Sequence, residues 1–261
     1  MNKLSLDAFS LKLIAIITMG IQHTIIVLWE IFPIWAILPL QIVRGITFPI
    51  MAFFVVEGFR RSTNINKYML RLFVFACVAQ IPYILAFGLP MLNIIFTILL
   101  GVALLKMYEN LYVEKSKRGL FVVLFILISI VSVGFFEGGL VGPILIFMFH
   151  VIKDEKKRRL WPLIFWGVTT LVFGLLNRLT FGFMDADAVA EMGTLMQFEL
   201  MMAQHWVFPL GPFLVIPLLL AYNGERGRKA KYLFYAFYPG HLAVLAIISF
   251  ALGLSALPFN L

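Results

Sequence analysis

The sequence predicts an all-α, polytopic membrane protein, and two observations carry that prediction. Hydrophobic residues make up 62% of the chain and charged residues only 13%, whereas soluble domains have about half and about a quarter. The hydrophobic residues also come in runs of about 20, the length that a helix needs to cross about 30 Å of hydrocarbon. Backbone groups in lipid must be satisfied within their own segment, and barrel strands would alternate in polarity, so helices are expected.

About nine hydrophobic segments follow one another, and we expect each to form a transmembrane helix. They cover residues 11–31, 36–59, 68–88, 93–113, 119–135, 139–152, 160–177, 204–222 and 232–256. The first is interpreted as a retained span, because no small-residue cleavage site follows it. The sixth is short, and Gly138 and Gly139 indicate that it and the fifth are either full spans or a re-entrant hairpin. We expect one transmembrane domain over residues 1–261.

Lysine and arginine gather in every second loop. The loops after the second, fourth, sixth and eighth segments hold Arg60, Arg61, Lys67 and Arg71; Lys115, Lys117 and Arg118; Lys153, Lys156, Lys157, Arg158 and Arg159; and Arg226, Arg228, Lys229 and Lys231. Because cytoplasmic loops are enriched in these residues, the pattern predicts a cytoplasmic N-terminus and a multi-pass protein of the plasma or inner membrane. The same bias explains the net charge of +8, and no basic groove with aromatic platforms indicates a nucleic-acid partner.

The long outer connection, residues 178–203, is acidic. It carries Asp185, Asp187, Glu191 and Glu199. Two interpretations stay open: a helix in the membrane interface or a cap over an outward-facing site. The chain has a single cysteine, Cys77, and four scattered histidines, so neither a disulfide within the chain nor a metal site is expected.

Four ionisable residues lie within the first two segments: Lys12, His23, Arg44 and Glu57. Such groups cost several kcal/mol in a bilayer and are functional candidates by default. Lys12 and His23 are eleven residues apart, so they share a helix face about 16 Å apart along the axis. Arg44 and Glu57 are separated by about 20 Å on the returning helix. We therefore predict two levels, Lys12 with Glu57 near the inner edge and His23 with Arg44 in the outer third.

Further polar residues fall at matching depths. The fourth segment starts outside, which places Asn93 and Thr97 near the His23 level, although alone each would more often be a helix cap or an interhelical bond. His241 lies near the middle of the last segment. Two structural interpretations stay open, an ion pair for the lower level and a hydrogen-bonded core histidine for His23.

Several sequence motifs resemble one known family. The stretches LKLIAIITMGIQH, VRGITFPIMAFFVVEGFRRSTNINKYMLRL, AQIPY and LNIIFTILLGV, in this order, and FYAFYPGHL near the end are similar to the TraX family of conjugative-pilin acetylases. The clear match covers residues 11–105 and 231–243, with FEGGLVG as a weaker likeness between them. That family resembles the integral-membrane acyltransferases, where a basic residue precedes a first-span histidine by about ten residues, as Lys12 precedes His23.

This resemblance implies an enzyme, a membrane-embedded acetyltransferase. It would move an acetyl group from cytoplasmic acetyl-CoA to an acceptor at the outer side of the membrane, either a pilin-like N-terminal amine or another amine or hydroxyl. The expected partners are acetyl-CoA, membrane lipids and this acceptor, and no metal is expected. The implied catalytic residues are His23, Arg44, Asn93 and Thr97; the implied donor-binding residues are Lys12, Glu57, Arg60, Arg61, Tyr68 and Arg71; and His241 is a further matched position.

The sequence departs from the family pattern at two positions. Gln22 stands where members have an aspartate before the histidine, and Val43 stands where they have a glycine before the arginine. The group that orients His23 is therefore not identified, and both direct transfer and an acetyl-histidine intermediate stay open. Two other functions also stay open: a transporter or permease that uses His23 and Arg44 as a relay, and a non-catalytic assembly protein.

Overall fold

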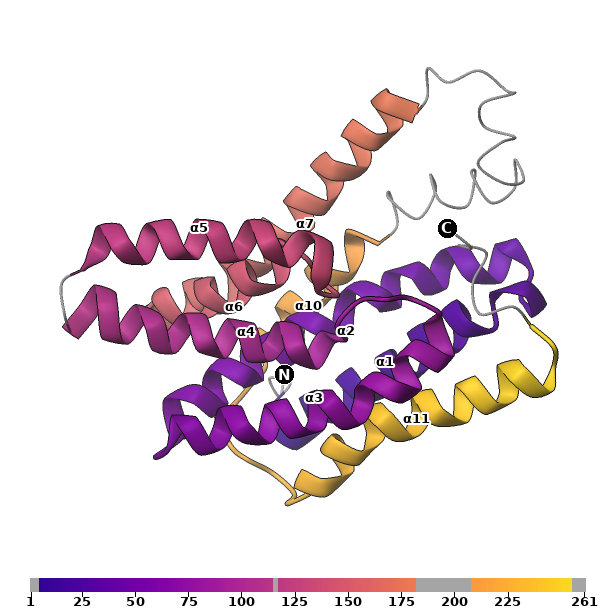
Figure 1. Ribbon diagram of the computed structural model, residues 1–261, viewed down its shortest axis with the longest axis horizontal. Helices are drawn as coiled ribbons and strands as arrows, with labels where there is room; N and C mark the ends of the chain where they lie inside the picture. The colour runs from indigo at the N-terminus through magenta and orange to yellow at the C-terminus, as the bar shows by residue number, and fades with distance from the viewer. Residues whose placement is uncertain (1–4, 115–116, 182–207, 255–261) are drawn as a thin grey trace. The chain divides into compact units, whose positions relative to one another are not determined.

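The computed structural model describes residues 5–114, 117–181 and 208–254, and these residues form a series of helices (Figure 1). The helices are α1 (Ala8–Val27), α2 (Ile34–Arg61), α3 (Ile65–Phe87), α4 (Ile94–Met107), α5 (Arg118–Phe135), α6 (Val141–Val151), α7 (Glu155–Phe181), α10 (Leu210–Leu220) and α11 (Lys231–Ala251). A 3₁₀ turn, η1 (Trp29–Ile31), follows α1, and a π-helical segment, η2 (Tyr108–Glu114), continues α4.

Each of the nine predicted segments corresponds to one helix, which confirms the all-α membrane fold. Seven helices in the described part of the chain are long and apolar enough to cross a membrane. The other two, α6 and α10, have only 11 residues each. A short sixth segment was predicted. The eighth was predicted to start at residue 204, and the acidic connection was predicted over 178–203; residues 182–207 lie outside the described part.

The exposed surface of the helices is apolar, as contact with lipid requires. On α5, Val122, Ile126 and Ile130 follow one another at every fourth position and are 46%, 51% and 62% exposed. Residues four apart share one helix face. In water such a stripe would be an association surface, whereas in a bilayer it faces lipid.

The chain divides into two compact units. Unit 1 comprises residues 1–50 and 159–227, and unit 2 comprises residues 51–158 and 228–261. One boundary falls inside α2, between Ile50 and Met51, so this helix belongs partly to each unit. The single domain expected over residues 1–261 stays a prediction.

In unit 1, the first half of α2 contacts two other helices. Thr47 hydrogen-bonds through its hydroxyl to Thr18 of α1, with 2.8 Å between the oxygens. Two residues earlier, Gly45 meets the start of α10: a β-carbon at Gly45 would lie 2.7 Å from the carbonyl oxygen of Phe208 and 2.7 Å from Cδ of Pro212. Small residues allow helix backbones to approach this closely in membranes.

Aromatic contacts complete unit 1. The Phe48 ring of α2 lies 5.0 Å from the Trp166 ring of α7, measured between centroids. On the next residue of α7, Gly167, a β-carbon would lie 2.6 Å from the Phe213 ring of α10. The three helices α2, α7 and α10 therefore pack through glycines and aromatic rings.

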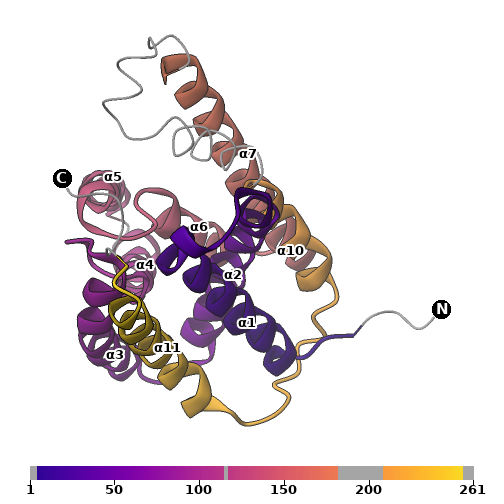
Figure 2. The same cartoon turned by 90° about the vertical axis from the view of Figure 1, so that its right-hand side faces the viewer.

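In unit 2, α3 packs between α11 and α4, and α4 in turn packs against α6. Figures 1 and 2 both show α11 running alongside α3. Gly101 of α4 makes room for Ile146 of α6, because a β-carbon at Gly101 would lie 2.5 Å from the Ile146 side chain. Phe53, from the second half of α2, makes an edge-to-face contact with Phe149 of α6 at 5.6 Å.

Contacts in unit 2 join helix ends that the loop charges assign to the same side of the membrane. Lys106, at the end of α4, donates to Asn66 at the start of α3 at 2.6 Å. At the opposite ends of these helices, Asn93 donates to Gln80 at 2.8 Å. The alternation of sides predicted from the lysines and arginines therefore agrees with the packing, and the assignment of one side to the cytoplasm stays a prediction.

Candidate functional site

His23 lies on α1 and is buried, with 3% of the residue exposed. Lys12 is half-buried, eleven residues earlier on the same helix. Between them, Thr18 turns its hydroxyl towards Thr47 of α2. Because His23 is buried, the side of α1 that carries it faces into the protein, and Thr18, about 140° further round the helix, contacts α2.

The contact between Thr18 and Thr47 fixes the relative depth of His23 and Arg44. The short connection of residues 28–33 returns the chain alongside α1, so α2 runs in the opposite direction. His23 follows Thr18 by five residues, about 7.5 Å, and Arg44 precedes Thr47 by three residues, about 4.5 Å in the same direction. The two side chains thus start within about 3 Å of the same depth, which agrees with the predicted upper level.

Arg44 is half-buried on α2. Its Nη1 donates to Oε1 of Gln41 at 2.7 Å, and its guanidinium lies 5.8 Å from the centre of the Phe208 ring. Gln41 itself is 4% exposed. A neighbouring amide and an aromatic face therefore hold the guanidinium within unit 1.

Asn93, predicted as a catalytic residue, has the geometry of a structural one. It is fully buried and caps α4, accepting through Oδ1 from the N–H of Ile95 at 3.0 Å. Its side-chain amide donates to the carbonyl of Ala76 and to Oε1 of Gln80, both at 2.8 Å. Both amide hydrogens are committed, so Asn93 ties α4 to α3.

Thr97 is also fully buried. Its hydroxyl donates to the backbone carbonyl of Glu137, in the turn between α5 and α6. The Glu137 carboxylate accepts through Oε2 from the N–H of Ile94 at 2.9 Å. Thr97 therefore positions an acidic residue at the start of α4. The sequence signal for it was weak, because Glu137 sits in FEGGLVG, where the family likeness is faint.

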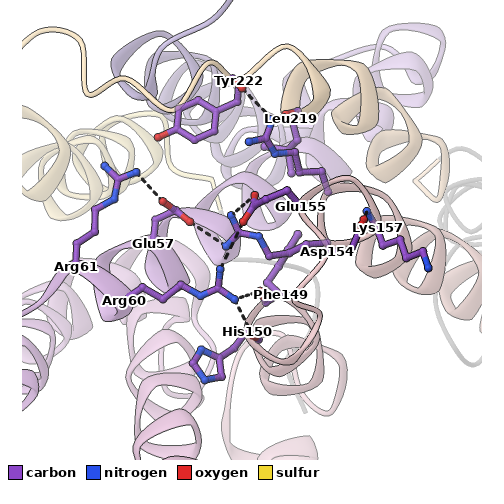
Figure 3. Close-up of polar contacts among 12 residues, drawn as sticks. Glu57, Arg60, Arg61, Phe149, His150, Asp154, Glu155, Lys157, Leu219 and Tyr222 are labelled. Carbon is purple, nitrogen blue, oxygen red and sulfur yellow. Dashed lines mark hydrogen bonds and ion pairs between the residues drawn. The ribbon is translucent and has the colours of Figure 1, made fainter.

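Glu57, at the end of α2, accepts hydrogen bonds from two arginines in unit 2. Its Oε2 accepts from Arg61, one helical turn later, at 2.8 Å (Figure 3). Its Oε1 accepts from Arg158 at 2.9 Å. Within unit 2, Glu57 is therefore ion-paired with two arginines, whereas the ion pair considered from the sequence was with Lys12. The side chain of Arg158 is only 3% exposed, although the sequence places Arg158 among the basic residues of a loop.

The remaining contacts of Arg158 explain how a guanidinium is buried here. Its Nη2 donates to Oε2 of Glu155 at 2.8 Å, and its plane lies 4.9 Å from the centre of the Phe53 ring. Two carboxylates and an aromatic face thus replace water around the charge. No sequence pattern indicates this burial, because Arg158 is one of five basic residues in its loop.

Arg60, predicted to bind the donor, caps the end of α6. Its Nη2 donates to the carbonyl oxygen of His150 at 2.7 Å (Figure 3), near the C-terminal end of that helix, where carbonyls lack partners within the helix. The His150 ring in turn lies 2.7 Å, through Nε2, from Oε1 of Glu109 in η2. The His150 side chain is only 9% exposed.

Tyr68 and Arg71 lie together near the start of α3. Tyr68 is 9% exposed, and its hydroxyl lies 3.0 Å from the position that a β-carbon on Gly58 would occupy. The Arg71 guanidinium lies 5.9 Å from the centre of the Tyr68 ring, and Arg71 is exposed. Tyr68 therefore packs against α2, and Arg71 presents a cation at the surface.

His241 is half-buried on α11. Its Nδ1 lies 2.6 Å from the carbonyl oxygen of Phe237, one turn earlier, and its ring stacks on the Phe237 ring at 4.6 Å. The Tyr238 ring lies 5.8 Å away. In the described ranges, no three histidine, cysteine or acidic side chains are grouped to hold a metal ion.

Comparison with known proteins adds a family context to these residues. The family model described as TraX protein matches residues 7–249. A curated protein of Dichelobacter nodosus, named "Probable fimbrial assembly protein FimC, serogroup H1", is 27% identical over 269 residues, covering 94% of this chain and 96% of that protein. No solved structure matches the chain.

Proposed function

Because the chain belongs to the TraX protein family, we propose that it is a membrane-embedded acetyltransferase of the inner membrane. It transfers an acetyl group from cytoplasmic acetyl-CoA to an amine or hydroxyl presented at the outer side. The fimbrial assembly name of the Dichelobacter nodosus relative supports a pilus-related role, with a pilin-like N-terminal amine as the acceptor.

The observation that carries this proposal is the buried His23 at the depth of Arg44. A neutral imidazole has one bare nitrogen that can accept a proton, which suits a general base. A guanidinium at the same depth suits the stabilisation of negative charge that develops on a carbonyl oxygen, especially where water is excluded. The histidine and the cation that acyl transfer requires both belong to unit 1.

Acetyl transfer from a thioester mainly requires the protein to transfer protons and to stabilise developing charge. The acceptor attacks the thioester carbonyl carbon, the carbonyl oxygen becomes an oxyanion, and the carbon–sulfur bond then breaks. His23 takes a proton from the acceptor and gives it to the departing CoA sulfur, so that N- or O-acetyl product and free CoA result. A transient acetyl group on His23 would divide the same transfer into two steps.

The donor is expected to dock on exposed cations of unit 2. The side chain of Arg61 is 57% exposed, and Lys67 and Arg71 are exposed near the start of α3. Arginine and lysine bind phosphate oxygens through charge-assisted hydrogen bonds. Arg60 contributes less to docking, because its guanidinium is engaged with the end of α6.

The test is a product analysis with isotopically labelled acetyl-CoA. Membranes containing the protein are incubated with the donor and with host membranes, and acetylated products are identified by mass spectrometry. Membranes with His23→Gln serve as the inactive control, and Gln22→Ala serves as the matched control, because its side chain points about 100° away on α1. Label that enters a product in the wild type and in Gln22→Ala, but not in His23→Gln, supports the proposal. Equal labelling of products by all three proteins would contradict the proposal.

A second experiment tests the sidedness. In oriented proteoliposomes, acetyl-CoA is confined to the face that carries the basic loops, and an amine acceptor is supplied only on the other face. Acetylation of that acceptor is expected, since His23 is predicted in the outer third of the membrane. Transfer that needs both substrates on the basic-loop face would contradict transfer across the bilayer.

A further inference from the structure

An apolar groove runs between α3 and α4, within unit 2. Its volume is about 440 Å³, and every side chain that lines it is apolar. Leu70 and Phe73 line it from α3, Phe96 and Ala103 line it from α4, and the turn after α5 adds Phe136. Leu70 and Phe73 are 61% and 49% exposed, so the groove opens on the apolar exterior of the helices.

A cation lies at one end of this groove. Lys106 follows Ala103 by three residues, so both lie on one face of α4. Asn66 precedes Leu70 by four residues and shares its face of α3 in the same way. Lys106 donates to Asn66 at 2.6 Å, and both residues are exposed. The pair therefore bridges α3 and α4 where the groove ends.

The groove has the depth of one leaflet of a bilayer. Lys106 follows Phe96 by ten residues, about 15 Å along the axis of α4, which is half of a hydrocarbon thickness of about 30 Å. On α3 the groove reaches no further than Phe73, in the first half of a helix that runs from Ile65 to Phe87. The groove thus lies in the leaflet next to Lys106, which the loop charges assign to the cytoplasmic side.

The size of the groove fits one hydrocarbon chain better than a neighbouring protein helix. A volume of about 440 Å³ lies within the range of small-molecule sites, about 300–1,000 Å³. A helix that crosses the membrane is about 10–12 Å wide and packs along about 30 Å. It would need a longer groove with no cation half-way along it.

We propose that the groove binds one acyl chain of an anionic phospholipid of the cytoplasmic leaflet, with the lipid phosphate on Lys106. An ammonium carries three N–H donors, so Lys106 can donate to a phosphate oxygen while it keeps the bond to Asn66. Basic positions between helices on the cytoplasmic side bind anionic head groups, through charge-assisted hydrogen bonds. A zwitterionic head group also presents a phosphate, but its own cation weakens the attraction to Lys106. The inference does not depend on the proposed acetyl transfer.

The test uses two photoactivatable lipids with the full-length protein in proteoliposomes. Both carry a diazirine at the end of the same acyl chain. One has the anionic phosphatidylglycerol head group and the other has the zwitterionic phosphatidylcholine head group. Each is present in trace amounts in vesicles of phosphatidylcholine, and the labelled residues are mapped by mass spectrometry of peptides after illumination.

Two variants, each with a matched control, separate the head group from the chain. Lys106→Gln removes the cation and keeps a hydrogen-bond donor, and Lys156→Gln removes an exposed cation elsewhere in unit 2. Ala103→Phe fills the groove with a ring, and Val122→Phe places the same ring on α5, at a position that is 46% exposed.

In the wild type, the anionic probe is expected to label the far end of the groove, near Phe96 and Phe136, about fivefold more than the zwitterionic probe. This ratio corresponds to about 1 kcal/mol for one cation near the membrane surface. The ratio should fall to about one in Lys106→Gln and should persist in Lys156→Gln. Ala103→Phe should remove the labelling of the groove by both probes, and Val122→Phe should leave it unchanged.

Several results would overturn the inference. Equal labelling by both probes in the wild type, or a ratio that Lys106→Gln leaves unchanged, would mean that the site does not select an anionic lipid. Labelling that Ala103→Phe does not reduce would mean that the chain lies outside the groove. A groove that stays unlabelled in a dimeric protein would mean that a second copy of the chain covers it. If Ala103→Phe fails to fold, the comparison of Lys106→Gln with Lys156→Gln still decides the question.

Discussion

Glu57 and Arg158 are 101 residues apart in the chain, yet Oε1 of the first lies 2.9 Å from Nη1 of the second in a nearly dry part of unit 2. Breaking a buried ion pair is strongly destabilising, because removal of one partner leaves the other charge without compensation. Arg158→Met should therefore destabilise the protein by about 3–5 kcal/mol. Arg61→Met, which removes the more exposed partner of the same carboxylate, should cost under about 1 kcal/mol.

The check is thermal unfolding in detergent, followed by size-exclusion chromatography. The double variant Glu57→Gln with Arg158→Met should be more stable than Arg158→Met alone, since it removes both charges together. A double variant less stable than either single variant would contradict the buried pair.

His23→Ala and His23→Gln should lower acetyl transfer by about 10² to 10⁴ at unchanged insertion and amount, because each removes the ring nitrogen that accepts the proton. The measurement is the initial rate of product formation per folded molecule, with Gln22→Ala as the neighbouring control. A rate within a few-fold of the wild type would rule out catalysis by His23.

Gly45→Ala should destabilise unit 1 by about 1–3 kcal/mol, the usual cost of an overfilled core. Its new β-carbon would lie 2.7 Å from the backbone oxygen of Phe208, and backbone cannot move aside cheaply. Gly134→Ala on α5 is the matched control, because nothing lies within 4 Å of its β-carbon position. The measurement compares the melting temperatures of the two variants in the same detergent. Equal melting temperatures would mean that α2 and α10 are not packed this closely.

Asn93→Ala should lower the stability of the fold far more than it lowers the rate of acetyl transfer. The cap at Ile95 alone contributes about 0.5–2 kcal/mol, and the carbonyl of Ala76 would lose a buried donor. We expect transfer per folded molecule to change by less than about tenfold, below the loss that a missing catalytic donor causes. The measurement is the rate of acetyl transfer divided by the folded fraction. A loss of about 10³-fold in this rate would indicate that Asn93 is catalytic.

The topology can be tested with cysteines in a Cys77→Ala background. Lys156 and Pro90 are both exposed, and the loop charges place Lys156 in the cytoplasm and Pro90 outside. A cysteine at 90 should react with an impermeant thiol reagent in intact cells, and a cysteine at 156 should react only after the cells are opened. The reverse pattern would invert the orientation.

The fold could be predicted because hydrophobicity and loop charge are local signals. All nine segments correspond to helices, and the short sixth segment, residues 139–152, corresponds to the short helix α6. The bounds differ by a few residues, as at α7, which begins at Glu155 within the basic loop. Polar residues at a helix start do not show in a hydrophobicity pattern.

The partners of the polar residues could be predicted less well, because they depend on long-range packing. The depth of His23 and Arg44 follows from helix rise alone and agrees with the structure. Arg158 could not be distinguished from its basic neighbours, since only the fold buries it against Phe53. Asn93 was expected to be catalytic, whereas its contacts are those of a cap, an alternative that the sequence had left open.

The distance in sequence between Glu57 and Arg158 also has a consequence for biosynthesis. A ribosome that adds about 5–20 residues per second needs about 5–20 s to reach Arg158 after it has made Glu57. During that interval the second span must enter the membrane with its carboxylate uncompensated by the later arginine. Arg61 follows Glu57 by one helical turn and emerges within about a second, so the ion pair between them is available from the start. Arg61, which contributes little to the stability of the finished protein, is thus the partner that is available to Glu57 while the second span enters the bilayer.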